Sequence, residues 1–221
     1  HMAAAYLADE ALEPPFITLL ASGGHTAVIY TKSYTEFEIL GSTRDDAAGE
    51  AFDKAARVLG LPYPGGPSVE KLAREGEANI SFPKMFRGSG YDFSYSGLKT
   101  AVINYCHTRE QKGEEYSRAD VAASFQAAAC GVLAERAVAA AKEKKCKTIA
   151  AGGGVIANGY LRELLQKECG AAGIRLVLPE KKYCTDNAAM IAADGLVQYH
   201  AKNFADLSIN ACAHIPLGKK G

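Results

Sequence analysis

Apolar and polar positions along the chain divide it into three zones. In the first zone, about residues 15–40, the runs Phe16–Ala21, Thr26–Tyr30 and Phe37–Leu40 are short, apolar and bounded by turn residues. Such runs predict β-strands. The first two flank Ser22-Gly23-Gly24, which predicts a β-hairpin and not the strand, loop and helix of a dinucleotide-binding fold.

The second zone, about residues 43–143, is predicted to be mostly helical because its apolar residues recur at helical spacing. Pro67 suits the first position of a helix, and Ser117 followed three residues later by Asp120 resembles a capping box. The predicted helices are Asp45–Leu59, Ser68–Arg74, one capped by Ser96 that reaches about Tyr105, and one from Ser117 to about Lys142.

The third zone, about residues 147–202, alternates predicted strands and helices: Thr148–Ala151, Gly159–Cys169, Ile174–Leu178 and Asn187–Ala201. This alternation predicts parallel strands, whose carboxyl ends form the ligand-binding edge of such sheets. Gly152–Gly154 with Asn158 follow one strand, and Thr185-Asp186-Asn187 follow the next, so both groups are expected at one edge. Asp186 could bind a metal there or simply cap the last helix.

Two of the apolar runs end in a glycine-rich turn, Ser22–Gly24 and Gly152–Gly154. Glycines at a strand end can take positive φ and direct backbone N–H groups at an anion. Two such turns in one domain predict a nucleotide-like ligand held from both sides. An ordinary hairpin turn without a ligand is the alternative for the first of them.

Composition narrows the possible partners. The 221 residues carry 25 basic and 25 acidic side chains, so contact with nucleic acid must come from a local patch or a partner protein. No apolar run is expected to approach the roughly 18 residues of a membrane span. The six cysteines contain no C-x-x-C pair, which favours reduced core thiols in a cytoplasmic protein.

Aromatic and basic residues interleave between positions 82 and 95. Such a segment can stack nucleic-acid bases and neutralise phosphate, or its aromatic rings can simply pack under a long loop. The residues concerned are Phe82, Lys84, Phe86, Arg87, Tyr91, Phe93 and Tyr95.

Six motifs, in order and spacing, resemble the tRNA threonylcarbamoyladenosine transferase family, once described as O-sialoglycoprotein endopeptidases. The motifs are residues 20–26 (LASGGHT), 45–54 (DDAAGEAFDK), 63–67 (YPGGP), 93–100 (FSYSGLKT), 152–158 (GGGVIAN) and 184–190 (CTDNAAM). The resemblance runs from His1 nearly to the end of the chain. It implies an α/β fold of the actin-like ATPase class, shared with Hsp70 and sugar kinases, partial and with a helical insertion.

The resemblance also predicts the organisation of the chain. Residues 1–42 would complete the N-terminal part of the fold, residues 43–145 would form a helical substrate-binding insertion, and residues 146–221 a β-α-β-α subdomain. The chain is expected to be part of a longer enzyme whose N-terminal lobe it lacks.

Carried over by position, the substrate-binding residues of the family fall on Leu20, Ala21, Ser22, Gly23, Gly24, Asp53, Gly66 and Asn158. The Ser22–Gly24 turn would face the phosphate or carbamoyl end, and the backbone at Gly66 would approach the nucleotide closely. Asp53 would accept hydrogen bonds from ribose hydroxyls, and Asn158 would position the base or sugar. A solvated helix face is the alternative for Asp53.

The family binds one metal, iron or zinc, through an H-x-x-x-H pair and the aspartate found here at Asp186. His1 lies in register with the second histidine, 21 residues before Ser22, while the first histidine is absent. His-Met is also what a cloning site leaves behind, so both origins of His1 remain open. One histidine and Asp186 would hold iron or zinc poorly.

The implied activity is transfer of the threonylcarbamoyl group from threonylcarbamoyl-AMP to adenosine in the anticodon loop of tRNA. The metal and the N–H groups of the glycine turns would stabilise developing charge, without a serine or cysteine nucleophile. The implied setting is the cytoplasm, with partner proteins that include an actin-like paralogue and with no membrane.

Other functions are compatible with the same motifs. A non-catalytic actin-like scaffold would not need the Thr185-Asp186-Asn187 carboxylate. An ATP-dependent small-molecule kinase would share both glycine turns. A metalloprotease is disfavoured because the sequence has no H-E-x-x-H.

Overall fold

A five-stranded sheet with the order β3-β2-β1-β4-β5 forms the centre of the computed structural model, which describes residues 1–83 and 90–210. β1 runs antiparallel to β2 and parallel to β4, β2 and β3 are antiparallel, and β4 and β5 are parallel. The strands are β1 (Phe16–Ala21), β2 (Thr26–Thr31), β3 (Phe37–Ser42), β4 (Thr148–Gly152) and β5 (Arg175–Val177).

The sheet therefore joins strands from the first and the third zone of the sequence. The predicted hairpin is the β1–β2 pair, in which Ala21 lies opposite Thr26, and the predicted parallel pair is β4–β5. All six residues of β1 are buried, because β1 lies in the middle of the sheet and both of its faces are covered.

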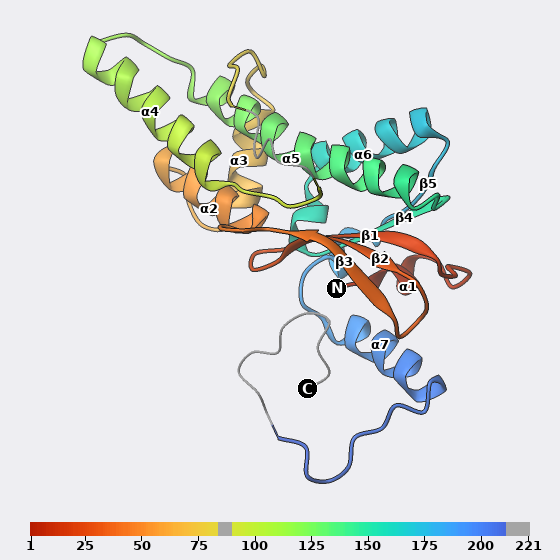
Figure 1. Ribbon diagram of the computed structural model, residues 1–221. Coiled ribbons are helices and arrows are strands. Elements are labelled where there is room, and N and C mark those ends of the chain that lie inside the picture. The colour runs from red at the N-terminus through yellow and green to blue at the C-terminus, as the bar shows by residue number, and fades with distance from the viewer. Residues whose placement is uncertain (84–89, 211–221) are drawn as a thin grey trace.

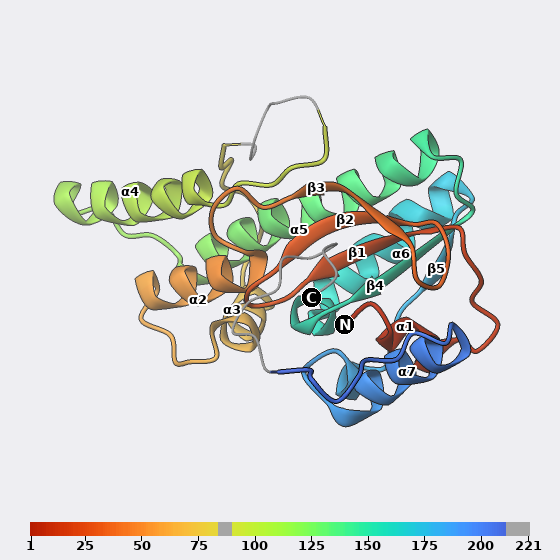
Figure 2. The same ribbon diagram turned by 60° about the horizontal axis from the view of Figure 1, so that its bottom comes forward.

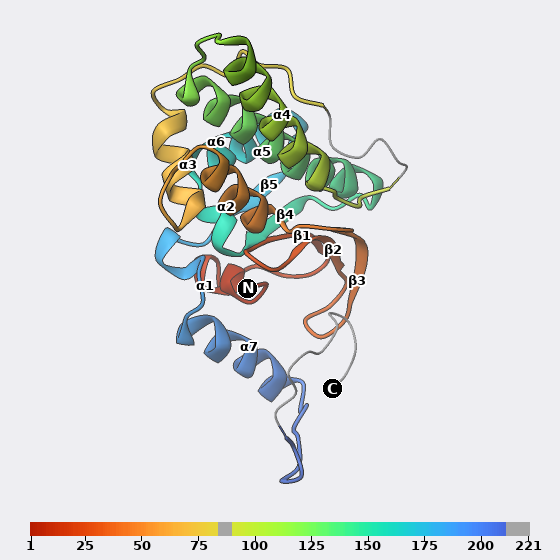
Figure 3. The ribbon, with the colours of Figure 1, turned by 90° about the vertical axis from the view of Figure 1, so that its left-hand side faces the viewer.

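Helices cover both faces of the sheet. α2 to α6 lie on one side, and α1 and α7 lie on the other (Figures 1 and 3). Seen from that second side, α7 lies beside α1 (Figure 2). The helices are α1 (Ala4–Ala8), α2 (Ala48–Val58), α3 (Gly65–Ala73), α4 (Ser96–Lys112), α5 (Arg118–Glu143), α6 (Gly159–Ala172) and α7 (Ala188–His200), with short 3₁₀ turns η1 (Gly154–Ala157) and η2 (Lys181–Tyr183).

Helix α2 begins at Ala48 and not at Asp45, because the Asp45 side chain is engaged elsewhere. Its carboxylate accepts hydrogen bonds from the Ser94 and Ser96 hydroxyls and from the Tyr95 N–H, which ties the start of α2 to the start of α4. Burial acts to raise the pKa of Asp45, but these hydrogen bonds together outweigh it and hold the pKa below its usual value.

The other predicted helix starts also differ in detail. α3 begins at Gly65, so Pro67 occupies its third position and not its first. α4 begins at Ser96 without a side-chain cap and continues to Lys112, beyond the predicted end. One of the two hydrogen bonds of the capping box predicted at the start of α5 is confirmed: the Ser117 hydroxyl accepts the Asp120 N–H at 3.0 Å.

Helix α5 is the central core helix. It is the one described helix long and apolar enough to cross a membrane by length and composition, and 72% of its 18-residue apolar stretch is buried inside the molecule. The expectation that no run approaches this length is therefore wrong for α5. Its apolar surface packs against the sheet and against α3 and α6.

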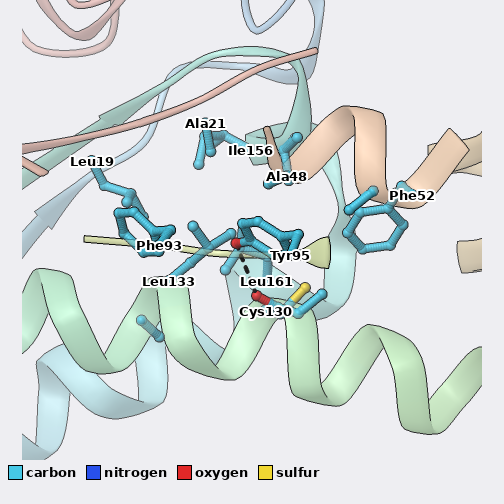
Figure 4. Packing of buried hydrophobic residues seen from close by; sticks show 14 of the residues in the cluster. Leu19, Ala21, Ala48, Phe52, Phe93, Tyr95, Cys130, Leu133, Ile156 and Leu161 are labelled. Atoms are coloured by element: carbon cyan, nitrogen blue, oxygen red, sulfur yellow. Dashed lines mark hydrogen bonds between the residues drawn. The ribbon is translucent and has the colours of Figure 1, made fainter. Parts of the chain in front are cut away.

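The aromatic residues at the end of the 82–95 segment belong to the core. Phe93 and Tyr95 are fully buried (Figure 4), and the Tyr95 hydroxyl donates to the carbonyl of Ala129 on α5 at 3.5 Å. Packing thus explains these two rings better than base stacking does. Lys84, Phe86 and Arg87, which the same prediction invoked, lie outside the described residues.

The cysteines follow the prediction of core thiols as far as the structure describes them. Cys106, Cys130, Cys146, Cys169 and Cys184 are all free and buried. Burial raises the pKa of each of these thiols, so they stay protonated and unreactive.

Candidate functional site

A cavity of about 490 Å³ lies where the glycine-rich turns after β1 and β4 meet the starts of α2, α3 and α6. This volume is in the usual range for a small-molecule or cofactor site. The lining residues are His1, Ser22, Gly23, Gly49, Phe52, Asp53, Tyr63, Pro64, Gly66, Pro67, Glu70, Gly154, Val155, Ala157, Asn158, Thr185 and Asp186.

The two glycine-rich turns lie against each other, and each contributes residues to the lining of this cavity. Gly153 has φ +103°, and a Cβ there would stand 2.2 Å from the carbonyl oxygen of Ala21 at the end of β1. Only glycine fits this position, because the backbone conformation and the close approach both exclude a side chain.

The hairpin turn is built differently. The Ser22 N–H donates to the His25 carbonyl at 2.7 Å, and the His25 N–H donates to the Ser22 hydroxyl at 3.0 Å. Neither Gly23 nor Gly24 has positive φ, and a Cβ at either would meet nothing within 4 Å. The expected left-handed conformation is therefore absent from the glycines of this turn, and Gly23 instead leaves space at the cavity wall.

Helices α2 and α3 form the opposite wall. The Asp53 carboxylate on α2 accepts the N–H of Gly65, the first residue of α3, at 2.8 Å. A Cβ at Gly65 would stand 2.5 Å from the Asp53 Cα, whereas a Cβ at Gly66 would meet nothing within 4 Å. Gly65 thus permits the two helices to pack closely, and Gly66 leaves the backbone of α3 accessible from the cavity.

Asn158 joins the cavity to the core. It is the N-cap of α6, and its Oδ1 accepts the N–H of Leu161 at 2.9 Å. Its Nδ2 donates to Oε1 of Gln126 on α5 at 2.8 Å, and the Cys130 thiol lies 4.0 Å from its Oδ1. Asn158 is only 8% exposed, so its amide is held in one orientation.

Sequence reasoning did not identify Glu70 as a cavity residue. Its Oε1 accepts the N–H of Gly159, the first residue of α6, at 3.1 Å and pairs with Arg74 at 2.6 Å. Glu70 lies one helical turn after Gly66 in α3, but the predicted helix began after Gly66, so the sequence did not place the two residues on one face. Tyr63 was also missed as a separate site residue, and its 85% exposed ring stands at the cavity mouth.

The loop before α7 brings Asp186 to the same cavity. The N-cap of α7 is Asn187, whose Oδ1 accepts the Met190 N–H at 2.9 Å. The alternative that Asp186 caps this helix is therefore wrong. Its side chain is 92% exposed, and its Oδ1 lies 3.4 Å from Nε2 of His1.

His1 and Asp186 place one nitrogen and one carboxylate where a metal could bind. Nδ1 of His1 is buried without a hydrogen-bond partner among the described residues. Residues 1–83 and 90–210 contain no group of three or more histidine, cysteine, aspartate or glutamate side chains arranged for a metal. Two donors are fewer than iron or zinc sites require, so the described residues alone do not fit this metal.

The charges around the cavity constrain what it can bind. Of the described residues that line it, Asp53, Glu70 and Asp186 are acidic, and none is lysine or arginine. A phosphate group would therefore have to rely on backbone N–H groups, such as those of the glycine turns, or on a bound cation.

Most of the residues carried over from the family meet at this cavity. Leu20 and Ala21 are buried strand residues behind the turn, and neither they nor Gly24 line the cavity. The predicted residues that line it are His1, Ser22, Gly23, Asp53, Gly66, Asn158 and Asp186.

Comparison with known proteins identifies the relatives. The sequence model of the family described as tRNA N6-adenosine threonylcarbamoyltransferase matches residues 1–193. A protein of that name from Clostridium botulinum (strain 657 / Type Ba4) is 49% identical over 222 residues, which cover 100% of this chain and 65% of the relative. One from Moorella thermoacetica is 52% identical over 98% of this chain and 64% of its own length. The chain thus spans 64–65% of the length of these two curated relatives.

Solved structures support the fold. Full-length HypF in its phosphate- and nucleotide-bound form matches with a TM-score of 0.71 at 14% identity, over 93% of this chain and 43% of HypF. The HypF of T. kodakarensis matches with a TM-score of 0.68 at 17% identity, over 90% of this chain and 36% of its own. These matches are consistent with the predicted partial actin-like α/β fold.

Proposed function

The chain belongs to the tRNA N6-adenosine threonylcarbamoyltransferase family, and we propose that its cavity holds the adenylate part of threonylcarbamoyl-AMP. The whole protein would transfer the threonylcarbamoyl group to adenosine in the anticodon loop of tRNA. The observation that carries this proposal is the convergence of both glycine turns, Asp53, Gly66 and Asn158 on one cavity of about 490 Å³.

The proposed reaction is an acyl transfer. The N6 amine of adenosine attacks the carbamoyl carbonyl carbon and forms the new C–N bond. The C–O bond to the AMP phosphate then breaks, AMP leaves with the electron pair, and the amine loses a proton. Backbone N–H groups of the turns at Gly23 and Gly154 are suited to stabilise the charge that develops on oxygen.

No side-chain nucleophile is required for this reaction. The cavity lining includes Ser22, but its hydroxyl already accepts the His25 N–H in the hairpin turn. No cysteine lines the cavity among the described residues. Cys130 contacts Asn158 from outside the lining, and burial raises the pKa of its thiol. Direct attack by the substrate amine is consistent with this lining.

The family implies a metal and a nucleotide-related substrate, and we assign the metal as iron or zinc. Asp186 and His1 are the described residues that would contribute to holding it, with the remaining donors coming from outside the described residues or from water. A cation there would also offset the acidic lining of the cavity. tRNA and partner proteins, among them an actin-like paralogue, complete the proposed cytoplasmic system.

Two matched glycine substitutions test nucleotide binding. Gly66→Leu in α3 places a side chain beside the cavity. Gly170→Leu in α6 places the same side chain on an exposed helix surface, away from the cavity. At both positions a Cβ would meet nothing within 4 Å, so both variants should fold. We expect AMP affinity, measured by isothermal titration calorimetry on the full chain, to fall at least about tenfold in Gly66→Leu only.

Three results would contradict the proposal. Equal AMP affinity in Gly66→Leu and the unaltered chain would place the nucleotide elsewhere. Rapid ATP-dependent phosphorylation of a small metabolite would favour the kinase alternative. Absence of binding to any adenine nucleotide would favour the scaffold.

A further inference from the structure

Gln126 is a buried amide on the central helix α5. It is 5% exposed and lies among apolar neighbours on that helix, next to Phe125, which is fully buried. Burying an amide is unfavourable unless it is hydrogen-bonded, and an apolar side chain of the same length would fill the same space. Its side-chain oxygen accepts a hydrogen bond from Asn158, which lies at the cavity wall.

The direction of this hydrogen bond is fixed by the fold. The carbonyl oxygen of the Asn158 side chain must face the Leu161 N–H in order to cap α6. Nδ2 of Asn158 must then face Gln126, and Gln126 must present its oxygen and not its nitrogen. The cap and the contact with α5 therefore hold the Asn158 amide at both ends.

One donor of this amide remains for a ligand. Nδ2 carries two N–H groups, and one of them donates to Gln126 at 2.8 Å. Nδ2 makes no second hydrogen bond among the described residues, and Asn158 lines the cavity. With the carbonyl end and one N–H already used, the second N–H is held in a fixed position before a ligand arrives.

We propose that Gln126 is a positioning residue for the nucleotide, because its Oε1 fixes the side-chain amide of Asn158 at the cavity wall. Gln126 does not line the cavity and acts through Asn158. This inference rests on the proposed function for its choice of ligand. The effect on the Asn158 amide itself does not depend on that function.

The test compares two buried polar residues of α5. Gln126→Met keeps the side-chain length and removes the acceptor. Ser124→Ala is the matched control, because Ser124 is 3% exposed and its hydroxyl accepts the Ile80 N–H at 3.0 Å, away from the cavity. In each variant a buried side chain loses one hydrogen bond, so loss of stability alone cannot distinguish them.

Two measurements are made on each variant of the full chain. NMR reports the side-chain amide signals of Asn158, assigned by their disappearance in Asn158→Asp, and calorimetry reports AMP affinity. We expect Gln126→Met to shift these signals, speed their hydrogen exchange and weaken AMP binding about tenfold. Ser124→Ala should change neither readout.

Each outcome decides the inference. Unchanged Asn158 amide signals in Gln126→Met would overturn it, as would shifted signals with unchanged AMP affinity. If the unaltered chain binds no AMP, the proposed function fails, while the amide signals still decide whether Gln126 positions Asn158. If Gln126→Met does not fold, Gln126→Asn replaces it, since its shorter side chain withdraws the oxygen from Nδ2.

Discussion

The two glycine-rich turns at the cavity contain similar residues but use their glycines differently. In the turn after β4, Gly153 has φ +103° and packs directly on the Ala21 carbonyl, so the chain itself requires a glycine. In the hairpin turn after β1, Gly23 and Gly24 lack positive φ and have open space where a Cβ would stand. There the fold does not require glycine.

This difference separates two reasons for which a glycine occupies a binding site. Gly153 lets two chain segments approach each other, and its effect is on folding. Gly23 lines the cavity and leaves a volume that a ligand can fill, so its effect is expected on binding. Neither reason can be assigned from a glycine-rich motif alone, because both produce the same composition.

The largest effect is expected for Gly153→Ala. The backbone conformation at Gly153 is nearly restricted to glycine, and the new Cβ would overlap the Ala21 carbonyl oxygen at 2.2 Å. Strain and overpacking together should lower the free energy of unfolding by about 2 to 6 kcal/mol. Urea denaturation followed by circular dichroism measures this loss.

A neighbouring glycine supplies the control. Gly154 lies one residue later, and a Cβ there would approach only the Thr185 side chain, at 3.7 Å, which is an ordinary contact. Gly154→Ala should therefore cost much less stability than Gly153→Ala. Equal denaturation midpoints for the two variants would remove the distinction between the two turns.

The sequence was sufficient for the strands and for two of their pairings, β1 with β2 and β4 with β5, but not for the β1–β4 pairing that joins them into one sheet. Strand boundaries agree within two residues, because the apolar runs are short and sharply bounded by glycine, proline and polar residues. Helix starts agreed less well. α2 begins at Ala48 because Asp45 binds the start of α4, about fifty residues away, and no local pattern contains that contact.

The residues of the candidate site likewise divide into those that the sequence predicted and those that it missed. Residues that carry a recognisable motif, such as Ser22, Asp53 and Asn158, were placed at one cavity. Glu70 and Gln126 were missed, because their partners, Gly159 and Asn158, lie on another helix far along the chain. Contacts of this kind become visible only when the tertiary fold is known.

A smaller effect is expected for Gly49→Ala, which tests how the hairpin turn is held from outside. The Gly49 N–H donates to the Ser22 carbonyl at 3.1 Å, and a Cβ at Gly49 would stand 2.8 Å from the Gly23 Cα. The overlap should outweigh the gain in helix propensity and lower the free energy of unfolding by about 1 to 2 kcal/mol.

The same variant should also displace the hairpin turn. Backbone amide chemical shifts of Gly23 and Gly24 measure this displacement, and AMP affinity should fall with it. Gly97→Ala in α4 is a suitable control, since a Cβ at Gly97 would meet nothing within 4 Å. Unchanged shifts at the hairpin turn would mean that it is held independently of α2.

The smallest effect on stability is expected within the hairpin turn itself. Gly23→Ala and Gly24→Ala should each leave the free energy of unfolding within about 1 kcal/mol of its original value, because neither position is strained or crowded. AMP affinity should separate them. Gly23 lines the cavity and Gly24 does not, so only Gly23→Ala should weaken binding, by about fivefold or more.

This pair tests the comparison most directly, because the two glycines are adjacent and share one turn. If both variants bind AMP equally well, the open space at Gly23 is not part of the ligand site. If Gly24→Ala loses as much stability as Gly153→Ala, the hairpin turn needs its glycines for folding after all. A loss of affinity confined to Gly23→Ala, without a loss of stability, would show that this glycine is there for the ligand.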